Sequence, residues 1–404
     1  MSEWKSVKLG ELYEVHNGLS KGRKFFGSGY PFLSFSTVFN NYFIPNELTD
    51  LVQSTESERN SYSIHRGDIF VTRTSETSDE LGMSCVALKD YPDATYNGFT
   101  KRMRPITDRV LPEYIGYYMR MPSFRGEFQA FSTMTTRASL KNEDLLSLSV
   151  CLPSLDEQNR IAQALLNYDN LIENNQKQIK LLEEAAQRLY KEWFVDLRFP
   201  GHEDVQIVDG VPEGWRKTPF SQKVDVMSGG TPKTSNPEYY NGSIPFYSPK
   251  DSSGAFFAFN TETHISQYGL DNCNSKLYPQ GTVIITARGT VGKTTILAVP
   301  MAMNQSCYAL KSDYFASVYY IFFALRQEIE ALKTMANGGV FDTIIVKTFD
   351  RISILDPGKA IIEKFDQAVS PFMGEIKNDM RKITYLTEAR DRLLPKLMSG
   401  EIEL

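Results

Sequence analysis

Residues 161–193 read IAQALLNYDNLIENNQKQIKLLEEAAQRLYKEW, from Ile161 to Trp193. Ten of these residues, most of them apolar, alternate at spacings of four and three. They are Ile161, Leu165, Tyr168, Ile172, Asn175, Ile179, Leu182, Ala186, Leu189 and Trp193. This spacing is that of a heptad seam, so the stretch predicts a long helix that packs on a partner helix.

The same seam returns 204 residues later, in the stretch that begins at Phe365. Its members are Phe365, Val369, Phe372, Ile376, Asp379, Ile383, Leu386, Arg390, Leu393 and Leu397. The polar break at Asn175 falls on Asp379 in the second copy. Two copies of one helix most simply pair antiparallel, and a polar pair of Asn175 and Asp379 would then fix the register. The alternatives are that each helix packs on its own globular block or on another protein.

Both helices also carry signals about their ends. Ser154 is a candidate N-cap for the first helix, with Glu157 as its capping-box partner. In the second helix Ser370-Pro371 is expected to act as a cap and first turn, which would split it into a short and a long helix. Arg390 is hard to bury on a seam and would mark a frayed end.

The blocks before the two helices repeat as well, at a looser offset. Tyr30–Ser34 matches Ile244–Ser248, and Gly67–Thr72 matches Gly281–Thr286. A repeat of this length indicates a pair of domains, because solenoid units run about 20–50 residues. Expected strands lie at 69–72, 85–88, 282–287 and 295–299, and expected helices at 111–120, 141–148 and 314–335.

The predicted fold class is therefore α+β. Two similar mixed α/β domains are separated by two long helices that form an antiparallel coiled coil, with a pseudo-twofold internal repeat. We assign 1–154 to the first domain, 155–196 to the first long helix, 197–357 to a linker and the second domain, and 358–404 to the second long helix.

Composition narrows the possible functions. The 404 residues suit two domains with connectors, and 41% hydrophobic residues suffice for two cores. No apolar run is long enough to span a bilayer, and Met1 to Glu11 lacks a secretory h-region. Four isolated cysteines and four scattered histidines indicate reduced thiols, a cytoplasmic location and no zinc motif. A net charge of −5 argues against binding nucleic acid through bulk charge, but allows a DNA reader with local basic patches.

Several motifs resemble those of one family. They are Leu152-Pro153-Ser154-Leu155-Asp156-Glu157-Gln158-x-x-Ile161, Trp193-Phe194-Val195-Asp196, Gly210-Val211-Pro212-x-Gly214-Trp215, Leu394-Pro395-Lys396-Leu397-Met398-Ser399-Gly400-Glu401-Ile402, and GTVIITARGTVGK from Gly281 to Lys293. In these motifs and their order the chain resembles the specificity subunit of type I restriction-modification systems, over nearly its whole length. Two departures are that the second helix lacks the Glu-Gln of the first, and that Thr72-Arg73-Thr74-Ser75 stands where the second domain has Thr286-Ala287-Arg288-Gly289.

The resemblance implies a role in a larger complex. Each domain, a target recognition domain in that family, would read one half of a bipartite, asymmetric site on double-stranded DNA. The helices would set the gap between the half-sites and dock two methyltransferase subunits. Those partners would bind S-adenosylmethionine and methylate adenine, and motor-nuclease subunits would use ATP and Mg. This chain would itself bind no cofactor or metal and catalyse nothing.

Candidate DNA contacts are basic and polar residues in Gly-flanked loops or just before a helix, where phosphates and base edges are read. They are Lys21, Arg23, Lys24, Thr74, Arg102 and Arg137 in the first domain, and Lys233, Arg288, Thr290, Lys293 and Asn337 in the second. The bland alternative for each is a solvated surface side chain.

Other motifs suggest catalysis but fit poorly. Ala287–Thr294 looks like a P-loop, yet its first position is Ala and the residues after it predict a strand, whereas a P-loop leads into a helix. Asn236-Pro237-Glu238-Tyr239 resembles the Asn-Pro-Pro-Tyr of adenine methyltransferases, but a carboxylate replaces the second Pro. An autonomous enzyme and a structural adaptor that never touches DNA remain the competing hypotheses.

Overall fold

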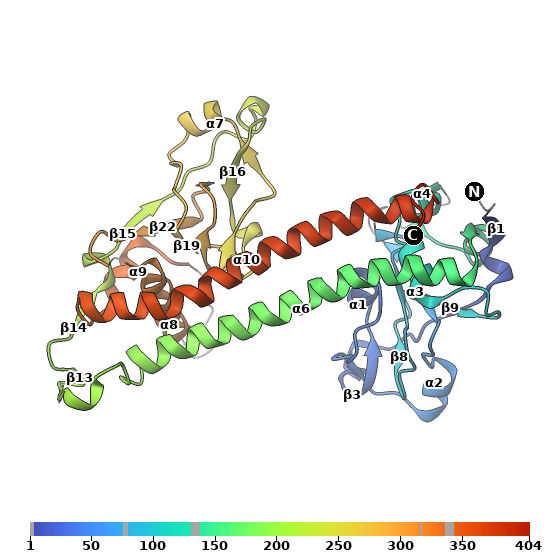
Figure 1. Ribbon diagram of the computed structural model, residues 1–404, viewed down its shortest axis with the longest axis horizontal. Helices are drawn as coiled ribbons and strands as arrows, with labels where there is room; N and C mark the ends of the chain where they lie inside the picture. Colours follow the sequence, from blue (N-terminus) through green and yellow to red (C-terminus); the bar gives the residue numbers. More distant parts are fainter. Residues whose placement is uncertain (1–3, 76–79, 131–137, 316, 336–342) are drawn as a thin grey trace. The chain divides into compact units, whose positions relative to one another are not determined.

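The computed structural model describes residues 4–75, 80–130, 138–315, 317–335 and 343–404. The chain divides into two compact units, residues 1–173 with 384–404, and residues 174–383. Each unit has its own hydrophobic core. Figure 1 shows the elements of both, coloured along the sequence.

The first unit is centred on a four-stranded antiparallel sheet in the order β2-β9-β5-β7. These strands are Tyr13–Asn17, Thr100–Pro105, Ile69–Thr72 and Ser84–Val86. A second sheet has the order β4-β3-β8, in which β3 pairs antiparallel with β4 and parallel with β8. Its strands are Leu51–Val52, Phe26–Leu33 and Thr95–Tyr96. Two small pairs join β1 (Lys5–Lys8) to β11 (Ser149–Leu152) and β6 (Thr74–Ser75) to β10 (Ala138–Ser139).

The second unit repeats this topology. Its main sheet has the order β15-β22-β19-β20-β17, with strands Asp225–Ser228, Cys307–Lys311, Val283–Thr286, Thr294–Leu297 and Phe257–Ala258. Its second sheet has the order β18-β16-β21, with strands His264–Ile265, Ile244–Tyr247 and Ala302–Met303. Here β16 is antiparallel to β18 and parallel to β21, as β3 is to β4 and β8. The remaining pairs are β14 (Arg216–Pro219) with β23 (Ser353–Asp356), and β12 (Ile207–Val208) with β13 (Val211–Pro212).

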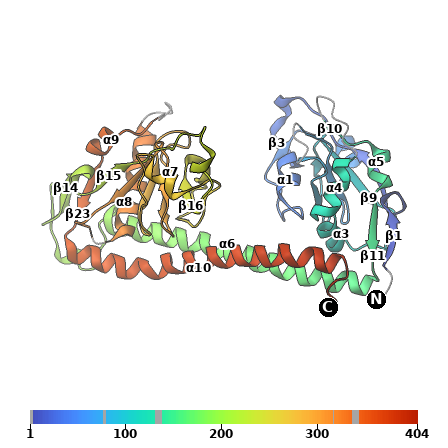
Figure 2. The ribbon, with the colours of Figure 1, turned by 90° about the horizontal axis from the view of Figure 1, so that it is seen from above.

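Both units also contain α-helices. In the first unit they are α1 (Phe35–Asn40), α2 (Glu56–Ser61), α3 (Pro112–Tyr118), α4 (Pro122–Ala130) and α5 (Asn142–Ser147). In the second unit they are α7 (Gln267–Asp271), α8 (Val318–Met335) and α9 (Val346–Arg351). Figure 2 shows α3 beside the strands of the first unit, where it contacts β7, and α8 beside those of the second, where it contacts β19 and β20. The predicted strands correspond to β5, β7, β19 and β20, and the predicted helices to α3, α5 and α8.

The two long helices are α6 (Leu155–Phe194) and α10 (Lys359–Met398), each of 40 residues. Ser154 caps α6, since its hydroxyl accepts a hydrogen bond from the Glu157 backbone N–H at 3.3 Å. Of the predicted seam residues, some are buried and the rest partly buried. The buried ones are Ile161, Leu165, Ala186, Trp193, Phe365, Val369, Ile376, Asp379 and Leu397, and the partly buried ones are Tyr168, Ile172, Asn175, Ile179, Leu182, Leu189, Phe372, Ile383, Leu386, Arg390 and Leu393.

Within the first unit, the start of α6 packs on the end of α10. Ile161 and Leu165 share a core with Leu394 and Leu397. Arg390 forms an ion pair with Asp169 and lies over the Tyr42 ring. The helix end is therefore held by this ion pair, and the expected fraying at Arg390 is wrong.

Within the second unit, the end of α6 packs on the start of α10. The rings of Tyr190 and Trp193 lie 6.0 and 5.9 Å from that of Phe365. Val369 and Met373 belong to the same core. In each unit the two helices run antiparallel (Figure 1).

The expected break of the second long helix is wrong, because α10 continues through Pro371. An interior proline costs about 3 kcal/mol, since it removes a backbone hydrogen bond. Val369, Met373 and Ile376 on the same stretch are fully buried, and their burial offsets that cost. Pro371 itself is exposed, so its ring does not disturb the core.

The seam carries one buried acid, Asp379. Its Oδ1 accepts a hydrogen bond from Lys382 at 2.8 Å, while Oδ2 is enclosed without a hydrogen-bond partner. The pairing of Asp379 with Asn175 stays a prediction.

The predicted fold class is confirmed: two similar mixed α/β domains form an internal repeat and are joined by two long antiparallel helices.

Candidate nucleic-acid interface

The loop between β19 and β20, residues 287–293, is closed by Thr286, the last residue of its buried strand. The Thr286 hydroxyl donates to the Thr290 carbonyl and accepts from the Lys293 N–H at 3.1 Å. The Thr286 N–H donates to the Lys293 carbonyl at 2.9 Å, and the Gly292 N–H donates to the Thr286 carbonyl at 2.9 Å. These bonds hold both ends of the loop together and leave its middle free to present side chains.

The loop between β5 and β7, residues 73–83, is closed in the same way by Thr72. Its hydroxyl donates to the Glu80 carbonyl at 2.6 Å and accepts from the Met83 N–H at 2.9 Å. Its backbone N–H donates to the Met83 carbonyl at 2.9 Å, and Gly82 donates to the Thr72 carbonyl at 3.1 Å. The two domains thus share one closure around loops of different length.

A glycine in each loop presses against a helix. Gly292 has a φ of +80°, and a Cβ there would lie 2.7 Å from Cγ2 of Ile329 on α8. Gly82 has a φ of +74°, and a Cβ there would lie 2.6 Å from Cγ of Phe128 on α4. Only glycine fits either position, because the backbone is left-handed and no space remains for a side chain.

Three of the predicted contacts in the second domain come together on the β19–β20 loop. Arg288, Thr290 and Lys293 are all exposed there. The Thr290 hydroxyl donates to the Pro249 carbonyl at 3.3 Å, which ties the loop to its neighbour. Lys233 is exposed on a different loop, after β15, and Asn337 lies outside the described residues. The loop leads into strand β20, as the sequence predicted, and therefore lacks the helix of a P-loop.

In the first domain Arg23 and Lys24 are exposed in a short 3-10 helix, η2 (Arg23–Phe25). The Lys24 ammonium lies 5.1 Å from the Phe25 ring centroid. Lys21 is engaged within the domain, since its Nζ contacts Glu58 Oε2 at 2.7 Å and donates to the Gln53 carbonyl at 2.6 Å. Arg137 and the side chain of Thr74 lie outside the described residues.

Arg102 is placed differently from the prediction. On β9 it is only 4% exposed, and its Nη1 donates to the Ser63 carbonyl at 2.7 Å. Its guanidinium lies 5.4 Å from the Tyr96 ring centroid. This side chain stabilises the sheet and is enclosed by it, so Arg102 is not available as a DNA contact in this structure.

The neighbouring basic residues of β9 are also used internally. Arg104 makes two hydrogen bonds to the Asp68 carboxylate, at 2.8 and 2.7 Å. Burial, together with the nearby Arg73, lowers the pKa of Lys101, whose ammonium donates to Asn142. The basic run of β9, Lys101-Arg102-x-Arg104, therefore makes contacts inside the domain.

Sequence reasoning missed a second repeat, on the helices that the two glycines contact. Arg125-Gly126-Glu127-Phe128-Gln129-Ala130 on α4 matches Arg326-Gln327-Glu328-Ile329-Glu330-Ala331 on α8. Phe128 and Ile329, which meet Gly82 and Gly292, occupy the same position in this motif. An arginine therefore lies three residues before the loop contact in both domains.

In the part of the chain that the structure describes, no cluster of His, Cys, Asp and Glu could hold a metal ion. Among the same residues, no helix is both long and apolar enough to cross a membrane. A duplicated chain that exposes basic residues, on the β19–β20 loop of one domain and on η2 of the other, fits the DNA-binding proteins built from two similar domains.

Comparison with known proteins gives the family. Residues 1–184 and 212–378 match the type I restriction modification DNA specificity domain, Methylase_S. The chain therefore belongs to the family of type I restriction-modification specificity subunits, the non-catalytic DNA-recognition components of these systems.

Individual specificity subunits are similar in sequence to this protein over its whole length. It is 25% identical to the type I restriction enzyme MjaIX specificity subunit of Methanocaldococcus jannaschii, over 100% of this chain and 94% of that one. It is also 25% identical to the type I restriction enzyme HindI specificity subunit of Haemophilus influenzae, over 100% of both. The crystal structure of a type I restriction-modification S subunit from M. genitalium has the same fold, with a TM-score of 0.58 at 15% identity, over 98% and 96% of the two chains.

Proposed function

We propose that each domain reads one half of a bipartite, asymmetric site on double-stranded DNA. The observation that carries this proposal is the pair of loops closed by Thr72 and Thr286. Each loop follows a threonine that closes it and contains a glycine that contacts a helix, but the two loops differ in length and side chains. A shared frame with different side chains suits two readers of one kind that recognise different bases.

The contacts proposed for the second domain are Arg288, Thr290, Lys293 and Lys233, together with Asn337. An exposed arginine can bind the O6 and N7 of guanine with two hydrogen bonds, and lysine suits a phosphate. In the first domain the proposal keeps Arg23, Lys24, Arg137 and Thr74. Arg102 is dropped because it is buried, and Lys21 because it already pairs with Glu58.

The helices α6 and α10 are proposed to set the gap between the half-sites and to dock two methyltransferase subunits. A shallow hollow of about 440 Å³ on the second unit supports docking, since it exposes apolar side chains on a helix surface. Leu181, Leu189 and Phe372 line it, and Leu181 is 67% exposed. The domain limits proposed are 1–154, 155–196, 197–357 and 358–404.

The cofactors are assigned to the partners. Methyltransferase subunits would bind S-adenosylmethionine, and motor-nuclease subunits would use ATP and Mg, whereas this chain would bind none of them. Its task would be to direct adenine methylation, and restriction of unmodified DNA, to one sequence.

Methylome sequencing tests this proposal. The chain is expressed with its cognate methyltransferase subunit in a host without DNA methylation, and N6-methyladenine is mapped by single-molecule sequencing. The proposal predicts a bipartite, asymmetric motif that is absent when this chain is omitted. Methylation by the methyltransferase alone, or an assembled complex that never methylates, would instead favour a structural adaptor.

A further inference from the structure

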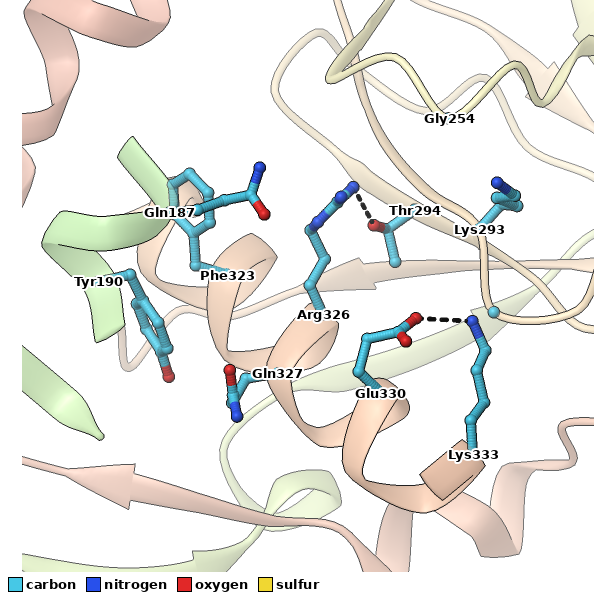
Figure 3. Close-up of a pocket in the computed structure, with 11 residues that line it drawn as sticks. Gln187, Tyr190, Gly254, Lys293, Thr294, Phe323, Arg326, Gln327, Glu330 and Lys333 are labelled. Carbon is cyan, nitrogen blue, oxygen red and sulfur yellow. Dashed lines mark hydrogen bonds and ion pairs between the residues drawn. The ribbon is translucent and has the colours of Figure 1, made fainter. Parts of the chain in front are cut away.

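A cavity of about 330 Å³ lies in the second unit, between α6, α8 and the β19–β20 loop (Figure 3). Its polar lining comes from all three elements. Gln187 and Tyr190 come from α6, Arg326, Glu330 and Lys333 from α8, and Lys293 from the loop. The cavity therefore adjoins the loop that the proposed function assigns to DNA.

The charge of this lining is positive. It holds three cations, Lys293, Arg326 and Lys333, and one carboxylate, Glu330. Glu330 pairs with Lys333 at 2.8 Å, as the dashed line in Figure 3 shows. For Lys293 no hydrogen bond or ion pair from its ammonium is found among the described residues. An anion is the ligand that this arrangement favours.

Arg326 is held in a fixed position within the cavity wall. Its guanidinium lies 5.0 and 5.3 Å from the ring centroids of Phe256 and Phe322. Its Nη1 makes a long hydrogen bond, 3.4 Å, to the Thr294 hydroxyl, and no other hydrogen bond of this guanidinium is found among the described residues. Burial lowers the pKa of Arg326, and the carboxylates of Glu183 and Glu330 act in the opposite direction. A partly desolvated guanidinium with most of its N–H donors unused is well placed to bind an oxyanion.

The loop brings the other cations together. Because Gly292 has no side chain, the loop closes onto α8, and a Cβ at Gly292 would lie 3.1 Å from Cε of Lys333. Lys293 is the next residue of the loop, and its ammonium lies 3.5 Å from the position that a Cβ on Gly254 would take. The close approach of loop and helix thus creates the cationic cavity.

The first domain carries the same arginine. Arg125 on α4 occupies the position of Arg326 in the repeated motif, and Gly82 approaches α4 as Gly292 approaches α8. Arg125 is half-buried, as Arg326 is. A cation behind the loop is therefore a feature of both copies, although the loops themselves differ.

We infer that this cavity seats one backbone phosphate of the DNA read by the second domain, bound by Lys293, Arg326 and Lys333. This inference rests on the proposed function. A phosphate contact positions the DNA and carries no base information, which fits an arginine that recurs behind two loops of different sequence.

The test measures binding of the complex of this chain and its methyltransferase subunit to fluorescent duplexes over a range of salt. One duplex carries the mapped motif and one a scrambled sequence. Arg326→Gln should weaken binding to both about tenfold, since it removes charge-assisted hydrogen bonds. It should also reduce the slope of log K against log salt by about 0.9, as expected for one lost phosphate contact. Lys311→Gln is the matched control, because Lys311 is a surface cation of the same unit that pairs with Asp313 and is not part of the cavity.

Neutral methylphosphonate linkages identify the phosphate itself. When they are placed one at a time along the duplex, one position should weaken the wild-type complex and leave Arg326→Gln unaffected. Unchanged salt slopes, or additive losses at every linkage, would overturn the inference. Loss of assembly with the methyltransferase subunit in the absence of DNA would also overturn it, because the cavity would then hold a carboxylate of a protein partner.

Two controls keep the result interpretable. Thermal unfolding followed by tryptophan fluorescence shows whether Arg326→Gln folds, and Lys333→Gln, at a partly exposed position, gives the same salt test if it does not. A wild-type complex with no preference for any sequence would instead refute the proposed function, so the two failures are distinct.

Discussion

Replacing Gly292 by alanine tests the close approach on which the β19–β20 loop depends. The left-handed backbone at Gly292 costs a residue with a Cβ about 1–2 kcal/mol. The new methyl would also lie 2.7 Å from Cγ2 of Ile329. Ile329 is 1% exposed and cannot move aside freely, so overpacking adds about 1–3 kcal/mol. The free energy of unfolding should fall by about 2–5 kcal/mol in total.

Gly281→Ala is the matched control. Gly281 has a similar φ, +87°, but a Cβ there meets nothing within 4 Å. This variant should lose only the conformational part, about 1–2 kcal/mol. The difference between the two variants isolates the contact between the loop and α8.

Urea unfolding followed by tryptophan fluorescence measures both variants. The chain has three tryptophans, and a Trp4→Phe background leaves Trp193 and Trp215. Both belong to the core of the second unit, so the signal reports that unit. A loss at Gly292→Ala no larger than that at Gly281→Ala would show that the added methyl does not clash with Ile329.

Three further predictions concern charged groups in the helices. Asp169→Asn should lower the free energy of unfolding of the first unit by about 2 kcal/mol, because it leaves Arg390 without its main partner. Asp391→Asn should cost under about 1 kcal/mol, because the Asp391 side chain is 53% exposed. Urea unfolding followed by circular dichroism compares the two variants, and equal losses would contradict the assignment of Asp169 as the main partner. Burial raises the pKa of Glu183, so ionisation of this carboxyl lowers the stability of the fold as the pH rises. Glu183→Gln should therefore unfold at a higher temperature than the wild type at pH 7, and this advantage should disappear below the ordinary glutamate pKa of about 4.3. An advantage that persists at pH 3 would show that ionisation of Glu183 is not its cause. Asp379 is fully buried, and its Oδ2 has no hydrogen-bond partner. Asp379→Leu should therefore raise the free energy of unfolding, measured in urea, by about 1 kcal/mol. A lower free energy of unfolding would show that the carboxylate stabilises the seam.

The long helices were the part of the fold that the sequence predicted best. A heptad pattern over 33 residues leaves few alternatives, and its repetition in one chain favours antiparallel pairing. The effect of Pro371 was misjudged because a local rule was applied to a helix whose neighbours are deeply buried. Burial of Val369 and Met373 keeps the helix continuous there.

The candidate contacts were harder to judge, because a charged residue on a strand can point into the domain or out of it. Arg102 lies on β9, where four consecutive residues are buried, so strand alternation gives no warning. The arginine repeat of α4 and α8 was missed for another reason. Its offset is 201 residues, between repeats offset by 214 and 204, and unequal loops hide it in the sequence.

We propose that the loop closed by Thr286 reads one half of the DNA site. The most direct test is the methylome of an Arg288→Ala, Thr290→Ala variant in complex with the methyltransferase subunit. If this loop reads the DNA, one half of the motif should become degenerate, while the other half and the gap stay unchanged. A motif with both halves intact, or one with both halves lost in a folded and assembled complex, would contradict it.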